Sequence, residues 1–454
     1  MAMTSPPSNH PLTDRGLWRH GDFLRLWAAQ AISAYGSRIT RTALPIIAVT
    51  TLGQPEAVLG VLAAMQLVPG VILAMAAGGF VDRGRKRRIL IVSDVIRAAL
   101  VASLTLAWAL DALSMLQVIL VGAGVGAASA LFQITDVAYL PALIGRRRLA
   151  EGNAKLETTE AIAEITGPAS AGVLIAALGA PLAVAIDAAS YVWSAFMLGR
   201  IRRGEPRPGV PPVSAAGAAD AAEVDAALPV RTGEDFRIGL GAVFGHPLVR
   251  PIVLTLMVWS IMGGFFMALY TVYCLRELAL SEATFGVIIA MGGIGSLAGA
   301  MAARSLARTL GVGRTLVVTS TLGVACNLLI PIAASGTSHA MTIGFLAAHQ
   351  LFGDGFAVVF VIHAVTLRQT VLPRELLGRA NAAIHVCTSG VLPVAALAAG
   401  GLATLIGIRA AVWVGVVIGL VAPIFVWRLR HLKDMPTGER GASESGMARS
   451  ETGG

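Results

Sequence analysis

Charged residues are scarce in this sequence. Asp, Glu, Lys and Arg make up 13% of its 454 residues, whereas a soluble domain carries about 25%. Hydrophobic residues make up 56%, and the mean hydropathy is +0.74. Because a soluble fold would have too few polar side chains to cover its surface, the composition excludes ordinary soluble domains and disordered chains.

Cysteine is also rare, and its placement excludes two further classes. Cys274, Cys326 and Cys387 stand far apart in apolar runs, so the sequence carries neither a disulfide framework nor Cys-based metal spacing. A nucleotide-binding loop of the G-x-x-x-x-G-K-[ST] type is also absent, which argues against ATP as the energy source. We therefore expect no metal and no other cofactor.

Long apolar runs are what the sequence has instead. A helix needs about 20 apolar residues to cross the hydrocarbon core of a bilayer. Charge-free runs of suitable length are Ala57–Val81, Ala112–Thr135, Ile165–Ile186, Pro251–Leu275, Ala283–Ala303, Thr315–Gly353, Ala380–Ile408 and Ala410–Trp427. Further spans with a few charges are Leu24–Leu52, Ile89–Leu110 and Leu182–Gly199. With Thr315–Gly353 divided at the polar turn Ser335–Ser338, the pattern predicts an all-α polytopic membrane protein with twelve transmembrane helices.

The positions of Lys and Arg predict its orientation. The net charge is +9 and the pI is about 10.2. The basic residues concentrate in alternate loops, whereas the other loops hold only Arg276 and Arg409. Basic loops stay on the cytoplasmic side, and the polar segment 1–21 lacks the apolar stretch of a cleavable signal. We therefore expect a multi-pass protein of the inner (plasma) membrane with both termini cytoplasmic, whose charge faces anionic lipid rather than nucleic acid.

A loop rich in Pro, Ala and Gly divides the spans into two sets of six. The predicted organisation is a cytoplasmic tail 1–21, an N-terminal six-helix bundle 22–199, a cytoplasmic linker 200–245, a C-terminal six-helix bundle 246–430 and a cytoplasmic tail 431–454. Within the linker, Phe236–His246 is typical of a short surface helix.

The two sets also repeat one another. Leu140-Pro141 ends the fourth span and Asn153-Ala154 starts the fifth, while Leu372-Pro373 and Asn381-Ala382 occupy the same places around the tenth and eleventh. Internal repeats of this kind are typical of secondary transporters, whose substrate site lies between the repeats near the middle of the bilayer.

The loop between the second and third spans carries a motif. It reads Gly78-Gly79-Phe80-Val81-Asp82-Arg83-Gly84-Arg85-Lys86-Arg87 and resembles the signature G-x-x-x-D-R-x-G-R-[RK] of the major facilitator superfamily, with Gly84 directly after Arg83. Together with Leu26-Trp27, Ser93–Ala98 and Gly378-Arg379, it is similar to the branch that holds the enterobactin exporter and the macrolide efflux pumps. The resemblance covers roughly residues 22–430.

This resemblance implies two six-helix bundles that rock about a central site, and a gating role for the loop. Asp82 would dock on the start of the eleventh span, near Gly378–Asn381, and latch the cytoplasmic side shut, because the helix dipole favours negative charge there. Asp94 and Arg97 would support the loop. The predicted gating residues are Gly78, Asp82, Arg83, Lys86, Arg87, Asp94 and Arg97.

Ionisable residues inside the spans are the candidates for coupling, since burying them is costly. Arg38 and Arg41 lie three apart in the first span, and an unpaired Arg there costs about 2.5–3.5 kcal/mol on insertion scales. A buried, breakable pair of Arg41 with Glu164 or Asp136 is predicted, and structural pairs that tie helices together are the alternative. The candidates for coupling or for the substrate cavity are Arg38, Arg41, Asp136, Glu160, Glu164, Asp187 and Asp354.

Two further patterns bear on export. Gly167, Pro168 and Gly172 resemble the fifth-span motif G-P-x-x-G-G of drug–proton antiporters, which implies export and a tight outer seal. Trp259, Phe265, Phe266 and Tyr270 could form an aromatic wall for an apolar substrate, although ordinary helix packing explains them equally well.

Taken together, these patterns predict a monomeric secondary transporter and not an enzyme. Its function would be proton-coupled efflux of a small amphipathic molecule, such as a drug, a macrolide or a siderophore. Its partners would be that substrate, protons and the lipid bilayer. The alternative is proton-coupled uptake of a small metabolite on the same fold.

Overall fold

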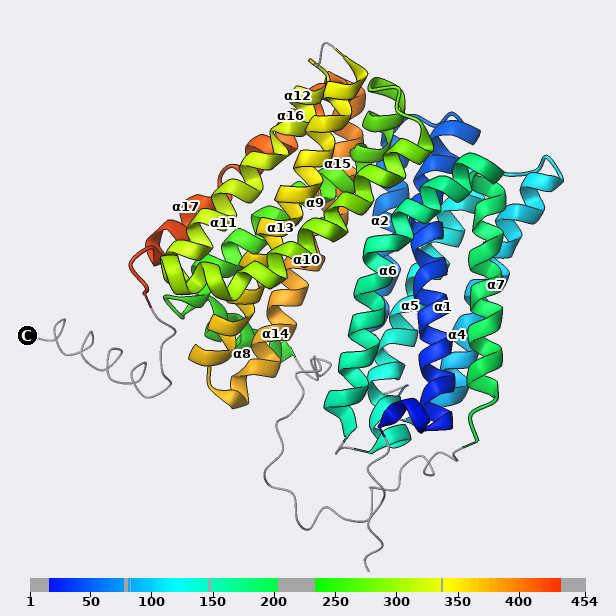
Figure 1. Cartoon of the computed structure of the whole chain (residues 1–454), viewed down its shortest axis with the longest axis horizontal. Helices are drawn as coiled ribbons and strands as arrows, with labels where there is room; N and C mark the ends of the chain where they lie inside the picture. Colours follow the sequence, from blue (N-terminus) through cyan, green and yellow to red (C-terminus); the bar gives the residue numbers. More distant parts are fainter. Residues whose placement is uncertain are drawn as a thin grey trace, which may run out of the picture.

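The computed structural model describes residues 16–76, 81, 83–145, 148–202, 233–335 and 338–433. Within these ranges all regular structure is helical (Figure 1). Gly78, Asp82 and most of the predicted linker lie outside the described residues.

Apart from the long segment between α7 and α8, the helices follow one another in the chain with short connections. They are η1 (Leu17–Arg19), α1 (Gly21–Ile46), η2 (Ile47–Thr51), α2 (Glu56–Ala76), α4 (Lys86–Ala109), α5 (Met115–Ile144), α6 (Leu149–Leu178), α7 (Ala180–Gly199), α8 (Gly233–Phe244), α9 (Val249–Val272), η4 (Tyr273–Glu277), α10 (Glu282–Leu310), α11 (Val312–Asn327), α12 (Leu329–Ala333), α13 (His339–Val371), α14 (Arg374–Ser389), α15 (Val391–Ile406), α16 (Ile408–Gly419), α17 (Ala422–Val426) and η5 (Trp427–Leu429).

Membrane-spanning helices account for most of the described chain. Ten are long and apolar enough to cross a bilayer, and the bent helix α6 makes an eleventh. The helix α1 has similar length but contains Arg38 and Arg41, whose charge lowers its hydropathy. Counting α1, the described residues form twelve spans, so the predicted all-α polytopic fold is confirmed.

One predicted span has the wrong boundaries. The charge-free run Ile165–Ile186 does not form a single helix, because the chain breaks at Gly179, which has φ +80°. The fifth span is α6, which begins at Leu149 and therefore includes the acidic residues that precede the apolar run. Charge-free length alone missed this, because α6 exposes carboxylates along its length.

Local geometry supports the internal repeat. The first and seventh spans each end in a five-residue π-helix, η2 and η4. The fifth and sixth spans are joined at Gly179, and the eleventh and twelfth at Gly407, with φ +80° and +84°. Residues with side chains rarely adopt this backbone conformation, so glycine is required at both places.

The spans form two sets, one from α1 to α7 and one from α9 to α17. We call them the N-terminal and C-terminal helix sets. They lean together at one end, the convergent end, which carries η2 and η4, and separate towards the divergent end, which carries η1 and α8 (Figure 1). Across the two sets, α6 packs along α10 and α2 packs along α15.

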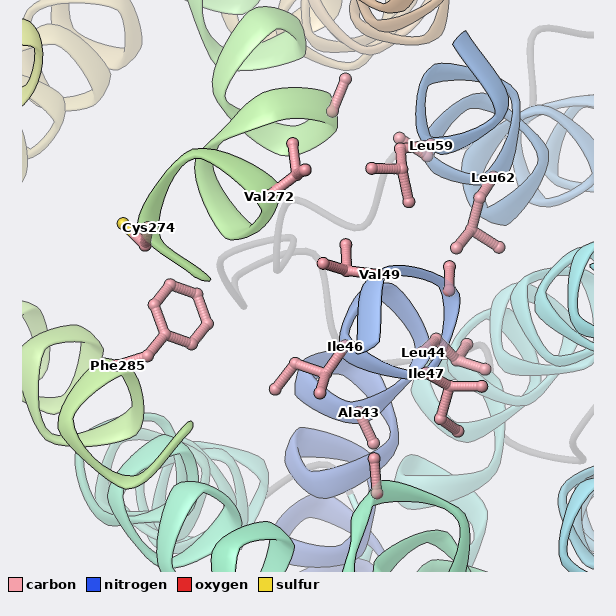
Figure 2. Packing of buried hydrophobic residues seen from close by; sticks show 14 of the residues in the cluster. Ala43, Leu44, Ile46, Ile47, Val49, Leu59, Leu62, Val272, Cys274 and Phe285 are labelled. Atoms are coloured by element: carbon pink, nitrogen blue, oxygen red, sulfur yellow. The ribbon is translucent and has the colours of Figure 1, made fainter. Parts of the chain in front are cut away.

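A shared apolar cluster fills the convergent end. Figure 2 shows Ile46 and Val49 at the end of the first span, with Leu59 of α2 on one side and Val272 of the seventh span on the other. All four side chains are at most 5% exposed. Because this cluster continues from one helix set into the other, the convergent end is closed by side-chain packing.

The predicted surface helix in the linker is present as α8. It packs on α14 so closely that a Cβ atom on Gly239 would lie 2.3 Å from the Arg379 carbonyl oxygen. The start of the eleventh span, where the resemblance places the docking site of Asp82, therefore lies against α8.

Candidate functional site

A central cavity of about 1270 Å³ lies between the two helix sets. The N-terminal set contributes Ser37, Thr40 and Arg41 of α1 to its wall, and the C-terminal set contributes Phe266 and Tyr270 of α9. The remaining wall is mostly apolar. A large apolar cavity with a few convergent polar groups is the usual form of a small-molecule site.

An ion-paired cluster lies beside this cavity. Arg38 is buried, with 5% of its side chain exposed, and its Nη2 atom contacts Glu160 and lies 2.6 Å from Glu164 Oε2. The side chains of Glu160 and Glu164 are 51% and 55% exposed. The carboxylates lie four residues apart on one face of α6, so one guanidinium can reach both.

Arg38 and not Arg41 forms this pair, which corrects the sequence-based prediction. Arg41 lies within electrostatic reach of Glu164, but it is exposed and lines the central cavity. Three residues along an α-helix turn the side chain by about 60° from the first direction. That rotation is enough to point Arg38 at α6 and Arg41 at the cavity.

Gly167 of the antiporter-like motif makes room for Arg38. A Cβ atom at position 167 would lie 2.7 Å from both Cβ and Cγ of Arg38. The glycine thus lets the arginine lie flat against α6 and present its guanidinium to Glu164, one turn away, and to Glu160, two turns away.

Asp136 has a different partner from the predicted one. Gln30 Nε2 donates a hydrogen bond of 2.6 Å to Asp136 Oδ1. Both side chains line a second cavity of about 630 Å³, formed by α1, α5 and α6, which Arg41 and Glu160 also line. Asp136 is therefore in the same polar region as the ion-paired cluster, although no ion pair joins it to Arg41 within the described residues.

Asp187, a candidate for the substrate cavity, lines neither the central cavity nor the second cavity. It is fully buried between α1 and α7, where it accepts hydrogen bonds from Thr40 and, at 3.0 Å, from Ser190. It faces Gly36 of α1, where a Cβ atom would lie 2.5 Å from Asp187 Oδ1. This carboxylate joins two helices of the N-terminal set.

Asp94 and Arg97, two of the predicted gating residues, form a buried ion pair. Arg97 contacts the Asp94 carboxylate, which also accepts a 2.6 Å hydrogen bond from Ser194 of α7. The guanidinium lies 4.5 Å from the Phe132 ring and 4.4 Å from the Tyr191 ring. These contacts tie α4, α5 and α7 together.

The described part of the loop motif contacts its own helix set. Lys86 starts α4, and Arg83 is exposed. Arg87 donates from Nε to the Leu198 carbonyl at 2.8 Å and also bonds the Gly199 carbonyl. Cations favour the carbonyl end of a helix, so Arg87 stabilises the end of α7.

Asp354 of α13 lies in a third cavity of about 310 Å³, which we call the side pocket. Trp259, Phe266, Tyr270 and His349 also line it. Phe265, in contrast, is buried against Gly415 in helix packing. The sequence identified most of these side chains individually, but their assembly from α9 and α13 could not be read from it.

Contacts at the convergent end were missed by the sequence analysis. Arg276 of η4 lies 3.5 Å from Glu56 of α2 and donates to the Val49 carbonyl at 3.2 Å. Thr50 donates to Glu282 at 3.4 Å. Each contact joins the N-terminal to the C-terminal helix set. The sequence does contain one indication of these contacts. Arg276 is one of only two basic residues in the loops predicted to lie on the side opposite the basic loops.

Two close backbone approaches accompany these polar contacts. At Gly172 of α6, a Cβ atom would lie 2.7 Å from Gly286 Cα of α10, and at Gly60 of α2 it would lie 3.0 Å from Gly400 Cα of α15. The carbonyl of Pro168 also faces Gly286. The antiporter-like motif therefore contacts the ion-paired cluster through Gly167 and the other helix set through Pro168 and Gly172.

Among the described residues, no group of three or more His, Cys, Asp or Glu side chains is arranged to hold a metal ion.

Solved structures with a similar fold are transporters. A bacterial homologue of the iron transporter ferroportin in an inward-facing state has a TM-score of 0.70 at 16% identity, covering 92% of this chain and 100% of that one. A structure of such a homologue in an outward-facing state has a TM-score of 0.55 at 16% identity, covering 90% and 99%. A bacterial homologue of the human lysosomal transporter Spinster, also inward-facing, scores 0.66 at 14% identity, covering 91% and 98%.

Sequence comparison gives the family. A search of curated proteins finds no relative that matches the chain. The family model described as Major Facilitator Superfamily matches residues 26–391, which is more than half of the sequence. The twelve spans, the central cavity between two helix sets and this match lead to one conclusion: the chain belongs to the Major Facilitator Superfamily.

Proposed function

We propose that this protein is a proton-coupled exporter of small amphipathic molecules that works by alternating access, in the branch of the enterobactin exporter and the macrolide efflux pumps. The observation that carries the proposal is the Arg38 cluster. A buried guanidinium holds two half-exposed carboxylates beside the central cavity, and proton coupling requires such a pair that can be made and broken.

The orientation follows from the basic residues. Arg83, Arg87, Arg314 and Arg430 lie at the divergent end, which we place in the cytoplasm of an inner membrane, with both termini on that side. The bundles would comprise residues 22–199 and 246–430. The convergent end, closed by the apolar cluster and the Arg276 contacts, would then face outwards. The higher TM-score against the inward-facing homologue supports this assignment.

Repulsion between charges of the two helix sets suggests how coupling works. Glu164 of the N-terminal set lies close enough to Asp354 of the C-terminal set for their charges to repel. With both carboxylates ionised, this repulsion opposes closure of the cytoplasmic side. Either a proton or a bound substrate can relieve it, so the two compete for the same charge. That competition is what an antiporter requires.

Two arginines surround the carboxylates of the cluster with positive charge. Arg38 contacts both Glu160 and Glu164. Arg41, on the cavity wall, adds positive charge within reach of the same carboxylates.

Everted membrane vesicles provide the test. With an acidic lumen, we expect vesicles that contain the protein to accumulate one member of a panel of macrolides, siderophores and dyes, and to lose this accumulation when the pH gradient is collapsed. Glu164→Gln should abolish the dependence on the gradient without reducing expression. Asp111→Asn, in a loop at the convergent end, is the matched control and should transport normally.

Two outcomes would contradict the proposal. Gradient-dependent transport that Glu164→Gln leaves unchanged would remove this residue from the mechanism. Proton-driven movement in the opposite direction, into intact cells, would establish uptake by symport instead of export.

A further inference from the structure

The side pocket opens beside the central cavity. Phe266 and Tyr270 of α9 line both spaces, so these two rings form the partition between them. A volume of about 310 Å³ is at the lower end of the range of small-molecule sites. A molecule in the central cavity could therefore place one substituent in the side pocket.

The pocket contains a carboxylate without a counter-ion. Within the described residues, neither a hydrogen bond nor an ion pair joins Asp354 to another side chain. Gly292 of α10 faces it directly, since a Cβ atom there would lie 2.1 Å from Asp354 Oδ2. Glu164 of α6, which lies within electrostatic reach of Asp354, is also acidic. An ionised carboxylate inside a membrane span is costly unless it is paired, so the pocket favours a cation.

Aromatic rings surround the carboxylate. The Tyr270 ring centroid lies 6.5 Å from that of Phe266 and 6.1 Å from that of His349, and the His349 and Phe266 rings are 6.4 Å apart. The faces of Phe and Tyr rings carry negative potential and attract organic cations, with larger effect where water is excluded. The rings also offer apolar contact to alkyl groups on such a cation.

Among the residues that the structure describes, polar atoms of the pocket lining lack a hydrogen-bond partner. His349 is 8% exposed, and its Nδ1 atom is buried without a hydrogen bond; the same holds for Trp259 Nε1. Buried polar atoms are almost always hydrogen-bonded. A neutral imidazole nitrogen can accept a hydrogen bond from an ammonium group, while the indole can donate to a neighbouring oxygen of the ligand.

We propose that the side pocket binds the protonated amine of the substrate. The ammonium group lies against Asp354 and donates to His349, its alkyl groups contact Phe266 and Tyr270, and Trp259 donates to an adjacent oxygen. The transported molecules are thus organic cations. This assignment rests on the proposed transport function and names its substrate class, and it explains how the substrate would relieve the repulsion between Asp354 and Glu164.

A matched pair of probes tests the assignment. Propranolol is a protonated amine with a neighbouring hydroxyl group and an aromatic ring, and in its glycol analogue a hydroxyl group replaces the amine. Equilibrium dialysis against the full-length protein in lipid nanodiscs, corrected with empty nanodiscs, measures the affinity of each. We expect propranolol to bind at least tenfold more tightly than the glycol, and each tenfold step corresponds to about 1.4 kcal/mol.

Variants then locate the binding. Asp354→Asn should weaken propranolol binding about tenfold or more and leave the glycol unchanged, whereas Asp111→Asn should affect neither. Tyr270→Leu removes the ring and should weaken cation binding, while Tyr270→Phe retains it. This second pair keeps the test decisive if Asp354→Asn does not fold.

The outcomes separate the pocket from the transport function. Equal affinity for both probes, or no effect of Asp354→Asn and Tyr270→Leu, would overturn the pocket assignment even if transport in vesicles is intact. Binding that follows these variants without gradient-driven transport would instead overturn the proposed function and leave the pocket assignment standing.

Discussion

Replacing Gly172 with alanine should shift the protein away from the state with a closed convergent end. In this structure α6 and α10 meet at backbone distance, and the added Cβ atom would lie 2.7 Å from Gly286 Cα and 3.0 Å from the Glu282 carbonyl oxygen. Both neighbours are main-chain atoms of a helix, so no side chain can rotate away. The two helices must separate instead.

The size of the effect follows from these distances. Carbon atoms in contact normally lie about 3.5–4.0 Å apart, so the helices must move apart by roughly 1 Å. Overpacking of this kind costs about 1–3 kcal/mol. If the state with a closed convergent end is destabilised by that free energy, its population relative to the open state falls roughly 5- to 150-fold. The state that opens the convergent end does not need the contact and would gain what the closed state loses.

Double electron–electron resonance would measure this shift. Nitroxides at Leu110→Cys and His339→Cys, in a background without the native cysteines, report the distance between the two helix sets at the convergent end. We expect Gly172→Ala to populate a longer distance. Gly401→Ala is the matched control, because nothing lies within 4 Å of its Cβ position. An unchanged distance distribution in Gly172→Ala, with the protein folded, would refute the reasoning.

Three other predictions concern the remaining contacts. Reversing the Glu56–Arg276 pair by Glu56→Arg with Arg276→Glu should restore part of the closed population that either single variant loses, as measured with the same spin labels. Because the pair is partly exposed, each single variant should cost only about 0.2–1 kcal/mol. No recovery in the double variant would show that the charges do not interact. Gly167→Ala should displace Arg38 from α6 and reduce gradient-driven transport in everted vesicles, with normal expression; wild-type transport would mean that this contact is dispensable. His246 lies between α8 and α9, outside the spans, where partial burial lowers its pKa and its Nδ1 accepts a hydrogen bond from the Leu248 amide at 3.2 Å. A lowered pKa means that the folded protein binds the proton less well than the unfolded chain, so the contribution of His246 to the stability of the protein is lost as pH falls through the ordinary histidine range. The pKa of the imidazole measured by NMR should be below that of a free histidine. A raised value would contradict the burial argument.

The spans were predictable because bilayer thickness imposes their length. The helix break near Ser335 and the short helix within the linker both followed from residue type and order. The boundary of the fifth span did not, because α6 is acidic where it faces the space between the helix sets. Its start at Leu149 depends on tertiary surroundings that a hydropathy pattern does not contain.

The site was only partly predictable for a geometric reason. The candidates from the sequence included Arg38, Arg41, Glu160 and Glu164. Which arginine faces α6 is decided by the rotation of α1 about its axis. That rotation is set by the packing of Gly36 against Asp187 and of Gly167 against Arg38, which involves helices far apart in the chain. One sequence, without its packing, leaves both arginines equally suitable.

The side pocket was harder still to foresee. Its walls come from the seventh, ninth and tenth spans, and no local pattern connects Trp259 to Asn327 or His349. That Trp259 Nε1 and His349 Nδ1 lack hydrogen-bond partners is recognisable only when the helices are in place.

The hydrogen bond from Arg276 to the Val49 carbonyl has a consequence for mutational tolerance. The acceptor is a main-chain oxygen in η2, and every amino acid at position 49 supplies the same oxygen. Substitution can therefore remove this contact only from the arginine side, and a mutational scan should find position 276 less tolerant than position 49, which accepts other side chains of similar bulk.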